Sequence, residues 1–246
     1  MNEGDISRAA ERLAKTKSLL VITGAGISNE SGIPTFRGND GLWNNYRAEE
    51  LATLGAFERD PVTVWKWYDW RRGIIGKAEP NPGHLAIKEL EERFENFLLI
   101  TQNVDGLHGR TGVKNIVEIH GNLWRVRCMR EGTISMLMDV PLVSIPPKCQ
   151  CGALLRPDVV WFGESIPTQA LEQSFRALEM YDTLIVVGTS GAVYPVASFP
   201  ETVKRNGGFV IDVNMEETPI SRIADVALYG KSGEILPGLV KYLPSL

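Results

Sequence analysis

The chain has 246 residues, a hydrophobic fraction of 43% and a formal net charge of −4, values that are ordinary for one large globular domain or two small ones. No basic tract exceeds a few residues and no apolar run is long enough to cross a bilayer, so we expect neither direct nucleic-acid binding nor a membrane partner. Residues 1–17 lack the apolar region of a secretory signal, and the three cysteines suit a reducing compartment, so we expect a cytoplasmic protein.

Short apolar runs alternate with helical patterns along the chain. Residues 1–17 predict an amphipathic helix, and further helices are predicted at 83–95, 169–180 and 200–206, the first of these capped by Asn81. Nearly continuous apolar runs predict buried parallel strands at 18–23, 97–102, 116–119, 183–188 and 209–214. The alternation of strands and helices predicts an α/β fold with an open, doubly wound parallel sheet.

Two segments interrupt this alternation. Residues 36–80 carry four of the six tryptophans, and residues 121–155 carry all three cysteines. We predict a single domain, 1–246, in which a large lobe is formed by about 1–35, 81–120 and 156–246, and a small lobe by the two interrupting segments. The ligand is expected in the cleft between the small lobe and the carboxyl ends of the strands.

A glycine-rich turn, VITGAGISNESGIPTFRG, follows the first strand. Gly24 and Gly26 allow the backbone to approach a phosphate closely, and the amides that follow can donate to a pyrophosphate at a helix N-terminus. A dehydrogenase fingerprint requires a third glycine where this chain has Asn29, and an acidic residue about twenty positions later, where the tryptophan-rich segment lies. The turn therefore predicts dinucleotide binding but argues against hydride transfer.

Polar side chains follow two of the predicted strands. Gln102, Asn103 and Asp105 come just after one strand, and His120 follows the next. His120 is the best candidate for a general base, because an imidazole titrates near neutral pH. His84, in the first turn of a predicted helix, is assigned a structural role. His108 shares a loop with Asp105, and both a role in the site and a bracing role are open for it.

Six motifs in order, GAGISNESGIPTFRG, TQNVDGLH, HGN, LLRPDVVWFGE, VGTS and DVNMEE, resemble the sirtuin family of NAD-dependent protein lysine deacylases. The resemblance covers about residues 7–243. It implies a Rossmann-like large lobe, a small lobe formed by two insertions, NAD as co-substrate, and acyl-lysine side chains of proteins as the second substrate. The expected products are nicotinamide, O-acyl-ADP-ribose and free lysine.

The resemblance also assigns roles to individual residues. His120 would be the base that accepts a ribose hydroxyl proton, and Asn103 would hold the ribose for catalysis. The residues assigned to NAD are Gly24, Ala25, Gly26, Ile27, Ser28, Ile33, Pro34, Phe36, Arg37, Trp43, Gln102, Asn103, Val104, Asp105, Gly188, Thr189, Ser190, Asn214, Met215, Glu216 and Ser232.

The stretch WKWYDWRRG places Tyr68 and Arg71 three residues apart, on one face of a predicted helix. Taken alone, this aromatic stretch would be interpreted as core, with Arg72 solvated and Trp65, Trp67 and Trp70 packed. The Tyr-x-x-Arg spacing resembles class III sirtuins, in which the pair binds the carboxylate of succinyl- or malonyl-lysine. Removal of acidic acyl groups as well as acetyl is therefore expected. The substrate residues that the resemblance implies are Tyr68, Arg71, Ala52, Val160 and Phe162.

The chain departs from the family at the cysteines. Most sirtuins bind a structural Zn²⁺ with two C-x-x-C pairs, whereas this chain has Cys128, with Glu131 in place of the second thiol, followed by Cys149 and Cys151 in CQC. Three thiolates with a carboxylate or water could hold zinc, and three small buried thiols without metal are the alternative.

Two other functions fit the same NAD site. One is a mono-ADP-ribosyltransferase with a different nucleophile, and the other is a non-catalytic sensor of NAD or ADP-ribose. The presence of both Asn103 and His120 argues against the sensor, since a sensor needs no base.

Overall fold

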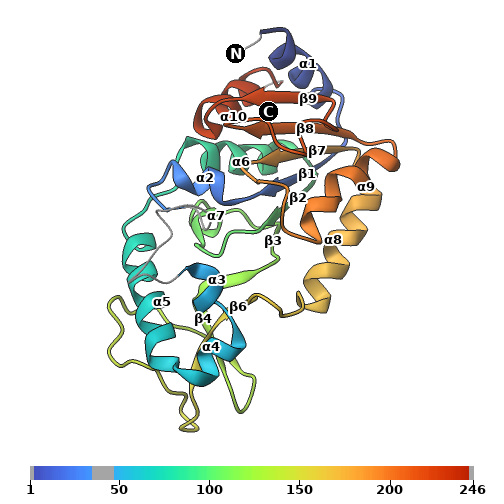
Figure 1. Cartoon of the computed structure of the whole chain (residues 1–246). Coiled ribbons are helices and arrows are strands. Elements are labelled where there is room, and N and C mark those ends of the chain that lie inside the picture. The colour runs from blue at the N-terminus through green and yellow to red at the C-terminus, as the bar shows by residue number, and fades with distance from the viewer. Residues whose placement is uncertain (1–2, 35–46, 244–246) are drawn as a thin grey trace.

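The computed structural model describes residues 3–34 and 47–243, which form a larger and a smaller lobe (Figure 1). The larger lobe holds a six-stranded sheet of order β3-β2-β1-β7-β8-β9, in which every neighbouring pair is parallel. The strands are β1 Ser18–Thr23, β2 Asn96–Thr101, β3 Ile116–Glu118, β7 Thr183–Val187, β8 Phe209–Asn214 and β9 Val226–Tyr229. The predicted fold class is confirmed, and β9 is an additional strand.

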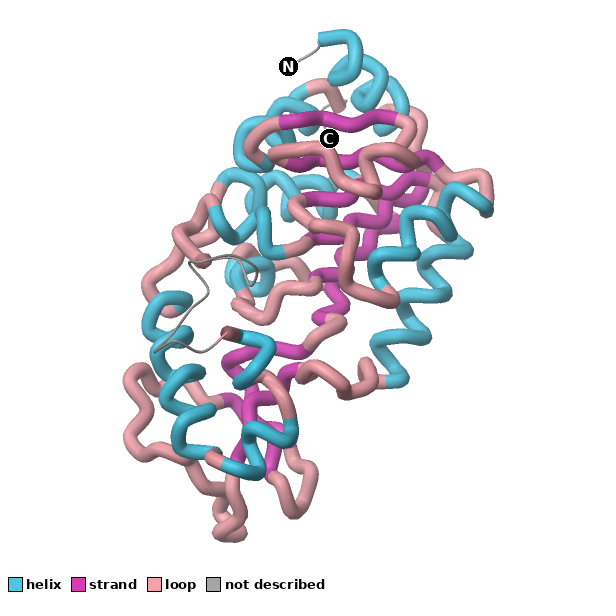
Figure 2. Tube along the Cα trace, in the orientation of Figure 1, coloured by secondary structure: helices cyan, strands magenta, loops and turns pink. Residues whose placement is uncertain are grey.

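Both faces of this sheet are buried, which explains the continuous apolar runs. In β1, Leu19 and Val21 join one core cluster, whereas Leu20 and Ile22 join another, because successive side chains of a strand point to opposite faces. Helices cover the two sides (Figure 2). The first cluster contains residues of α1 Glu3–Leu13, α6 Pro82–Arg93 and α10 Ser232–Lys241, and the second contains residues of α8 Thr168–Met180 and α9 Phe199–Arg205.

The helix boundaries follow local capping chemistry. Asn81 Oδ1 accepts from the Gly83 amide at 2.9 Å and Pro82 occupies the first position, so α6 begins where it was predicted. It ends at Arg93 because Phe94 is already extended. The sequence prediction missed α10, whose interior Pro237 lowers helix propensity. It also missed the shorter α7 Leu107–Arg110 and the 3-10 turn η2 Val196–Ser198. The helix expected after the glycine-rich turn is present as α2 Ala25–Asn29.

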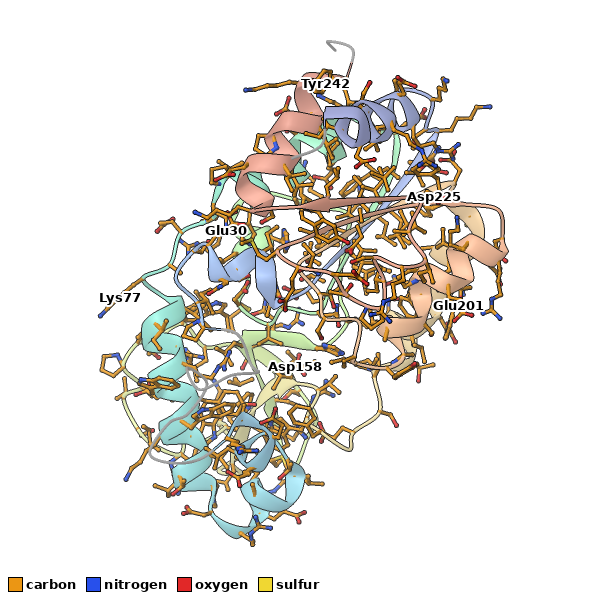
Figure 3. The ribbon with its side chains drawn as sticks, turned by 45° about the horizontal axis from the view of Figure 1, so that its top comes forward. Glu30, Lys77, Asp158, Glu201, Asp225 and Tyr242 are labelled. Atoms are coloured by element: carbon orange, nitrogen blue, oxygen red, sulfur yellow. The ribbon has the colours of Figure 1, made fainter. Side chains whose placement is uncertain are left out.

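The smaller lobe combines helices from one insertion with strands from the other. Its elements are α3 Ala48–Leu51, α4 Leu54–Arg59, α5 Pro61–Ile75, β4 Gly121–Cys128, β5 Ile134–Met136 and β6 Leu155–Val159, with antiparallel sheet order β5-β4-β6. The carboxylate of Asp158, labelled in Figure 3, pairs with Arg125 and Arg127 of β4 at 3.2 and 2.6 Å. Since β6 belongs to this sheet and Trp161 to its core, the predicted end of the second insertion at residue 155 is too early.

Arg72 was predicted to be solvated, and this prediction is wrong. The side chain is fully buried and donates to three backbone carbonyls, those of Leu123 (3.0 Å), Leu137 (2.5 Å) and Asp139 (3.0 Å). These carbonyls replace the hydrogen bonds to water that the guanidinium loses when it is buried. Of the neighbouring tryptophans, Trp65 and Trp67 are buried core residues as predicted, whereas Trp70 is only partly buried.

Within the described residues, no helix combines the length and the apolar character needed to cross a bilayer.

Candidate active site

The strand order reverses between β1 and β7, because the chain continues from β1 to β2 on one side and returns to β7 on the other. In open α/β sheets, ligands bind outside the carboxyl ends of the strands at such a point. The loops that follow β1, β2, β7 and β8 carry most of the residues expected to bind NAD.

Three glycines bring the loops after β1 and β7 into direct backbone contact. The Gly26 amide donates to the Gly188 carbonyl at 2.8 Å, so it joins the two loops instead of remaining free for a ligand. A Cβ on Gly26 would lie 2.7 Å from Gly188 Cα, and one on Gly24 would lie 2.8 Å from the Gly188 oxygen. Gly188 itself has a φ of +59°, and its own Cβ would lie 2.6 Å from the Ile27 amide nitrogen. The packing excludes side chains at all three positions.

A buried polar cluster lies beside this glycine contact. Asn103 Nδ2 donates to the Gly24 carbonyl and to Ser28 Oγ, both at 3.0 Å, and Ser28 Oγ donates to Asp105 Oδ2 at 2.7 Å. The Leu107 amide donates to the other Asp105 oxygen at 2.8 Å. Burial raises the pKa of Asp105, while these hydrogen bonds lower it. The cluster joins residues that were predicted separately from two motifs.

Further hydrogen bonds connect the remaining loops. Gln102 Nε2 donates to Thr189 Oγ1 at 3.1 Å, and Asn214 Nδ2 donates to the Thr189 carbonyl at 2.9 Å. Ser190, Met215 and Glu216 are exposed at the rim. Ala25, Val104 and Pro34 are half-buried, and Ile33 is buried. Phe36, Arg37 and Trp43 lie outside the described residues.

Ser232 is connected to the loop after β1 by a hydrogen bond to Glu30. The Ser232 hydroxyl donates to Glu30 Oε1, and the Gly233 amide lies 3.2 Å from both oxygens of this carboxylate, which is labelled in Figure 3. The first turn of α10 is therefore attached to the end of α2.

His120 has a defined tautomer. Its Nδ1 lies 3.2 Å from the Gln102 carbonyl oxygen, which can only accept, so Nδ1 carries the proton and Nε2 keeps its lone pair. Burial lowers the pKa of His120, which favours the neutral ring near pH 7. The structure thus presents His120 in the form that a general base requires.

Tyr68 and Arg71 are both buried on α5, 3% and 8% exposed. The Tyr68 hydroxyl accepts from Trp161 Nε1 at 2.8 Å, and burial raises the pKa of this phenol to about 12. Arg71 Cζ lies 5.3 Å from the centroid of the Trp67 ring. Burial lowers the pKa of Arg71, whereas the nearby Tyr68 and Asp105 raise it. Arg71 is therefore a desolvated cation beside the polar cluster.

The other predicted substrate residues come from α3 and from the segment after β6. Ala52 is buried, and its carbonyl accepts from the Phe162 amide at 2.9 Å. The Val160 amide donates to the His120 carbonyl at 2.9 Å. The structure thus brings Ala52, His120 and residues 160–162 together.

Four potential metal ligands gather in the smaller lobe. The ligand atoms of Cys128, Glu131, Cys149 and Cys151 all lie within 4.8 Å of one another. Cys128 Sγ lies 3.5 Å from Cys151 Sγ, and Cys149 Sγ lies 3.9 Å from Glu131 Oε2. Three thiols and a carboxylate are a donor set that fits tetrahedral zinc.

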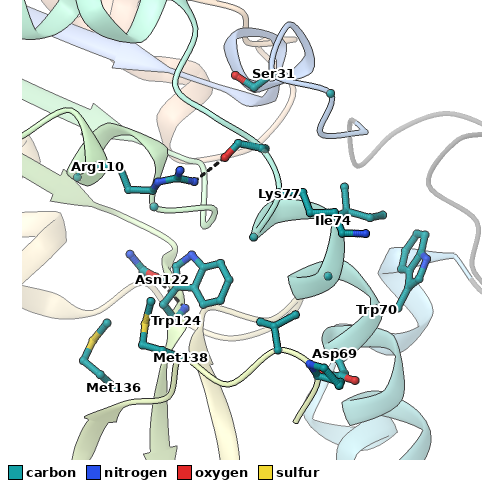
Figure 4. A pocket seen from close by; sticks show the side chains of 18 residues that line it. Ser31, Asp69, Trp70, Ile74, Lys77, Arg110, Asn122, Trp124, Met136 and Met138 are labelled. Atoms are coloured by element: carbon teal, nitrogen blue, oxygen red, sulfur yellow. Dashed lines mark hydrogen bonds between the residues drawn. The ribbon is translucent and has the colours of Figure 1, made fainter.

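A cavity of about 1290 Å³ opens between α5 and the β4–β5 hairpin (Figure 4). None of the predicted NAD, substrate or metal residues that the structure describes lines it. Trp124, on its wall, donates from Nε1 to the Asp105 carbonyl at 2.8 Å, so the cavity backs onto the polar cluster. Trp124 on the cavity wall and Trp161 beside Tyr68 were not predicted as site residues. Trp161 stands between Val160 and Phe162, in a motif that could have indicated it.

Comparison with known proteins gives consistent results. A family model described as the Sir2 family matches residues 24–195. An NAD-dependent protein deacylase of Aquifex aeolicus is 55% identical over 92% of this chain and 95% of its own length, and one of Pyrococcus abyssi is 51% identical over 96% of both. A solved Sir2 homologue–NAD complex has a TM-score of 0.91 and 49% identity, covering 96% of this chain and 93% of its own. A Sir2–p53 peptide–NAD⁺ complex has a TM-score of 0.84 and 32% identity, covering 98% of both chains.

Proposed function

The chain belongs to the Sir2 family and is an NAD-dependent protein deacylase, and from this premise we propose which of its residues perform the reaction. The observation that carries the proposal is the contact between His120 Nδ1 and the Gln102 carbonyl, which in the neutral ring leaves the lone pair at Nε2. A binding protein has no need of such a base, so a sensor is disfavoured. The relatives from Aquifex aeolicus and Pyrococcus abyssi are both named deacylases, which disfavours an ADP-ribosyltransferase.

The glycine contact supports the expected NAD site. Because side chains are excluded at Gly24, Gly26 and Gly188, the loops after β1 and β7 pack backbone against backbone, which fixes the glycine-rich turn where a pyrophosphate is expected. The rim residues Ser190, Met215 and Glu216 would then meet the adenosine half.

Bound NAD supplies an electrophilic ribose carbon when its bond to nicotinamide breaks. The Ser28–Asn103–Asp105 cluster is buried and internally hydrogen-bonded, so it can hold the nicotinamide ribose in one geometry and exclude water from the reacting carbon. His120 Nε2 would accept the proton of a ribose hydroxyl, which prepares that oxygen to attack the acyl carbon. The acyl-lysine carbonyl oxygen would form the new bond to the ribose carbon that nicotinamide leaves. After the ribose oxygen attacks the acyl carbon, one water would be consumed as the lysine amine departs, which gives nicotinamide, free lysine and O-acyl-ADP-ribose.

The acyl range proposed here includes succinyl and malonyl groups. A carboxylate that enters an apolar channel is strongly disfavoured unless it is paired. Arg71 offers it a buried guanidinium and Tyr68 a phenol that stays protonated, while the small Ala52 leaves room. Val160 and Phe162 would line the path of the lysine stem.

Cys128, Glu131, Cys149 and Cys151 would hold a structural zinc that links the β4–β5 turn to residues 149–151, far from the reacting groups. Free thiols at this site suit a reducing compartment, in keeping with the proposed cytoplasmic location.

Nicotinamide release with acetyl-, succinyl- and unmodified-lysine peptides tests the activity directly. We expect release with both acylated peptides and little with the unmodified one. Release that does not depend on acyl-lysine, with ADP-ribose label transferred to protein, would instead identify an ADP-ribosyltransferase.

A further inference from the structure

Three consecutive residues after β6 each contact a different part of the acyl site. The Val160 amide donates to the His120 carbonyl, and the Phe162 amide donates to the Ala52 carbonyl. Between them, Trp161 Nε1 donates to the Tyr68 hydroxyl at 2.8 Å, across 93 positions of sequence. Of these three residues, Trp161 is the one that hydrogen-bonds to the phenol.

The Trp161 ring is fixed by groups other than Tyr68. It is 1% exposed, with Arg156 Cζ 3.5 Å from its ring centroid and the Phe57 ring centroid at 5.3 Å. The Arg156 guanidinium donates to both oxygens of Glu164, at 2.5 and 2.8 Å, and Glu164 accepts from the Trp161 amide at 2.9 Å. The orientation of the indole N–H is therefore fixed by contacts that do not involve the phenol.

The direction of this hydrogen bond decides what Tyr68 can do. An indole N–H can only donate, so the Tyr68 oxygen must accept. The hydroxyl proton is not used in this bond, and among the described residues the Tyr68 oxygen makes no other hydrogen bond. Burial keeps the pKa of the phenol at about 12, so the proton stays in place. Tyr68 is thus left as a hydrogen-bond donor.

We propose that Trp161 is a positioning residue for acyl specificity: its indole N–H occupies a lone pair of the Tyr68 hydroxyl and so directs the hydroxyl proton to the carboxylate of an acidic acyl group. The inference rests on the proposed acyl range and deepens it. An acetyl group has no carboxylate, so Trp161 acts on the ratio of succinyl to acetyl activity. Phenylalanine at this position would preserve much of the packing and lose the selectivity.

The experiment compares wild type, Trp161→Phe, Tyr68→Phe and the double variant on succinyl- and acetyl-lysine peptides. We expect Trp161→Phe to raise KM for the succinyl peptide and to lower the succinyl-to-acetyl ratio of kcat/KM about fivefold, the factor that one neutral hydrogen bond is worth. The double variant should match Tyr68→Phe alone, because both changes remove the same contact.

Trp65→Phe is the matched control. The Trp65 indole donates to the Leu155 carbonyl at 2.8 Å in the same core, and its ring meets the Tyr68 ring edge-on with centroids 6.2 Å apart. Phenylalanine here loses an equivalent hydrogen bond, keeps an aromatic ring beside the phenol and leaves the hydrogen bond of the Tyr68 hydroxyl in place. It should lower the melting temperature and leave the succinyl-to-acetyl ratio unchanged. If Trp161→Phe does not fold, 3-benzothienylalanine at position 161 keeps the bicyclic shape with sulfur in place of N–H.

Three outcomes would overturn the inference. Equal losses of kcat/KM on both peptides in Trp161→Phe would show that Trp161 only packs the core. Additive effects of Trp161→Phe and Tyr68→Phe would show that the two residues act independently. An unchanged ratio in Trp161→Phe, with succinyl activity present in wild type, would refute the inference and leave the proposed function intact. Absence of succinyl activity in wild type would refute the proposed acyl range itself.

Discussion

Arg71 and Arg72 are adjacent on α5 and both buried, yet their surroundings differ. The Arg72 guanidinium is surrounded by backbone carbonyls of the β4–β5 region and lies 4.9 Å from the Trp124 ring centroid. Arg71 lies beside Tyr68, Trp67 and Asp105, at the boundary between the small-lobe core and the polar cluster. The first arrangement stabilises the lobe, and the second suits an anionic substrate.

This pair gives a matched test of the acyl site. Arg71→Met should raise KM for succinyl-lysine peptides roughly tenfold to a hundredfold, since charge-assisted contacts are worth about 1.5–3 kcal/mol. Arg72→Met should instead lower the free energy of unfolding by more than about 2 kcal/mol, because three buried carbonyls lose their donor. Steady-state kinetics and urea unfolding distinguish the two variants. Equal kinetic losses on succinyl and acetyl peptides in Arg71→Met would show that this residue braces α5.

Replacement of His120 tests the proposed base. His120→Ala should lower deacylation at least about a hundredfold, the usual effect of losing a general base. NAD binding, measured by calorimetry, should weaken far less, because His120 is expected to act on a proton and not to anchor the dinucleotide. Turnover close to wild type in this variant would refute the assignment.

The pH profile tests the same residue without mutation. His120 must be neutral to act, and burial lowers its pKa from the ordinary value of 6.5. The acid limb of kcat/KM should therefore have its midpoint below pH 6.5, and activity should be lost only as the pH falls through the lowered pKa. A midpoint above pH 6.5 would contradict the burial of this imidazole.

The four-ligand cluster predicts at most one zinc ion per chain. Metal analysis should find it, and Cys128→Ser should remove it, while Glu131→Gln should weaken binding without abolishing it because three thiols remain. Chelation should lower the melting temperature. Protein that carries no zinc and melts unchanged with chelator would support three buried thiols instead.

His84 and His108 predict a loss of stability in mild acid. Their rings lie 4.7 Å apart, and His108 Nε2 lies 3.0 Å from Thr23 Oγ1 in the interior. Burial lowers the pKa of His84 to about 4 and that of His108 well below 6.5. Below pH 6.5 these histidines bind protons in the unfolded chain but stay neutral in the folded chain. Their contribution to the free energy of unfolding is therefore fully present above pH 6.5 and is lost as the pH falls toward 4.

For His84 alone this loss is on the order of 3 kcal/mol over the whole interval. Urea unfolding of wild type and His84→Gln at pH 7.5, 6 and 5 measures it. The variant should be less stable than wild type at pH 7.5, and the difference should shrink as the pH falls. A constant difference would mean that His84 is equally protonated in both states.

Local signals explain why much of the fold could be predicted from the sequence. The buried strands have uninterrupted apolar runs, and α6 starts at an Asn-Pro pair, so both depend on neighbours in sequence. The position of His120 after a strand is a local feature of the same kind. Its tautomer is set by the Gln102 carbonyl on the neighbouring loop, which the pairing of β2 with β3 brings near.

The features that could not be predicted depend on distant residues. Nothing within WKWYDWRRG indicates that Arg72 is buried, because the carbonyls that accept from it belong to residues 123, 137 and 139. Trp161 lies 93 positions in sequence from Tyr68, to which it donates. The helical pattern of α10 is obscured because Pro237 lies inside the helix. The end of the small lobe was misplaced for the same reason, since β6 is recognised by its pairing with β4 and not by composition.

The smaller core has a consequence for the order in which the chain folds. Its α5 helix is synthesised long before β6, and β2 and β3 of the other lobe are made between them. While the chain emerges from the ribosome, the aromatic face of α5 has no β6 partner until residue 161 is available, because Trp65 and Tyr68 bond to Leu155 and Trp161. Long-range closure of this kind slows folding and exposes apolar surface. Nascent chains that stop before residue 155 should therefore recruit chaperones more strongly than chains that extend beyond residue 164.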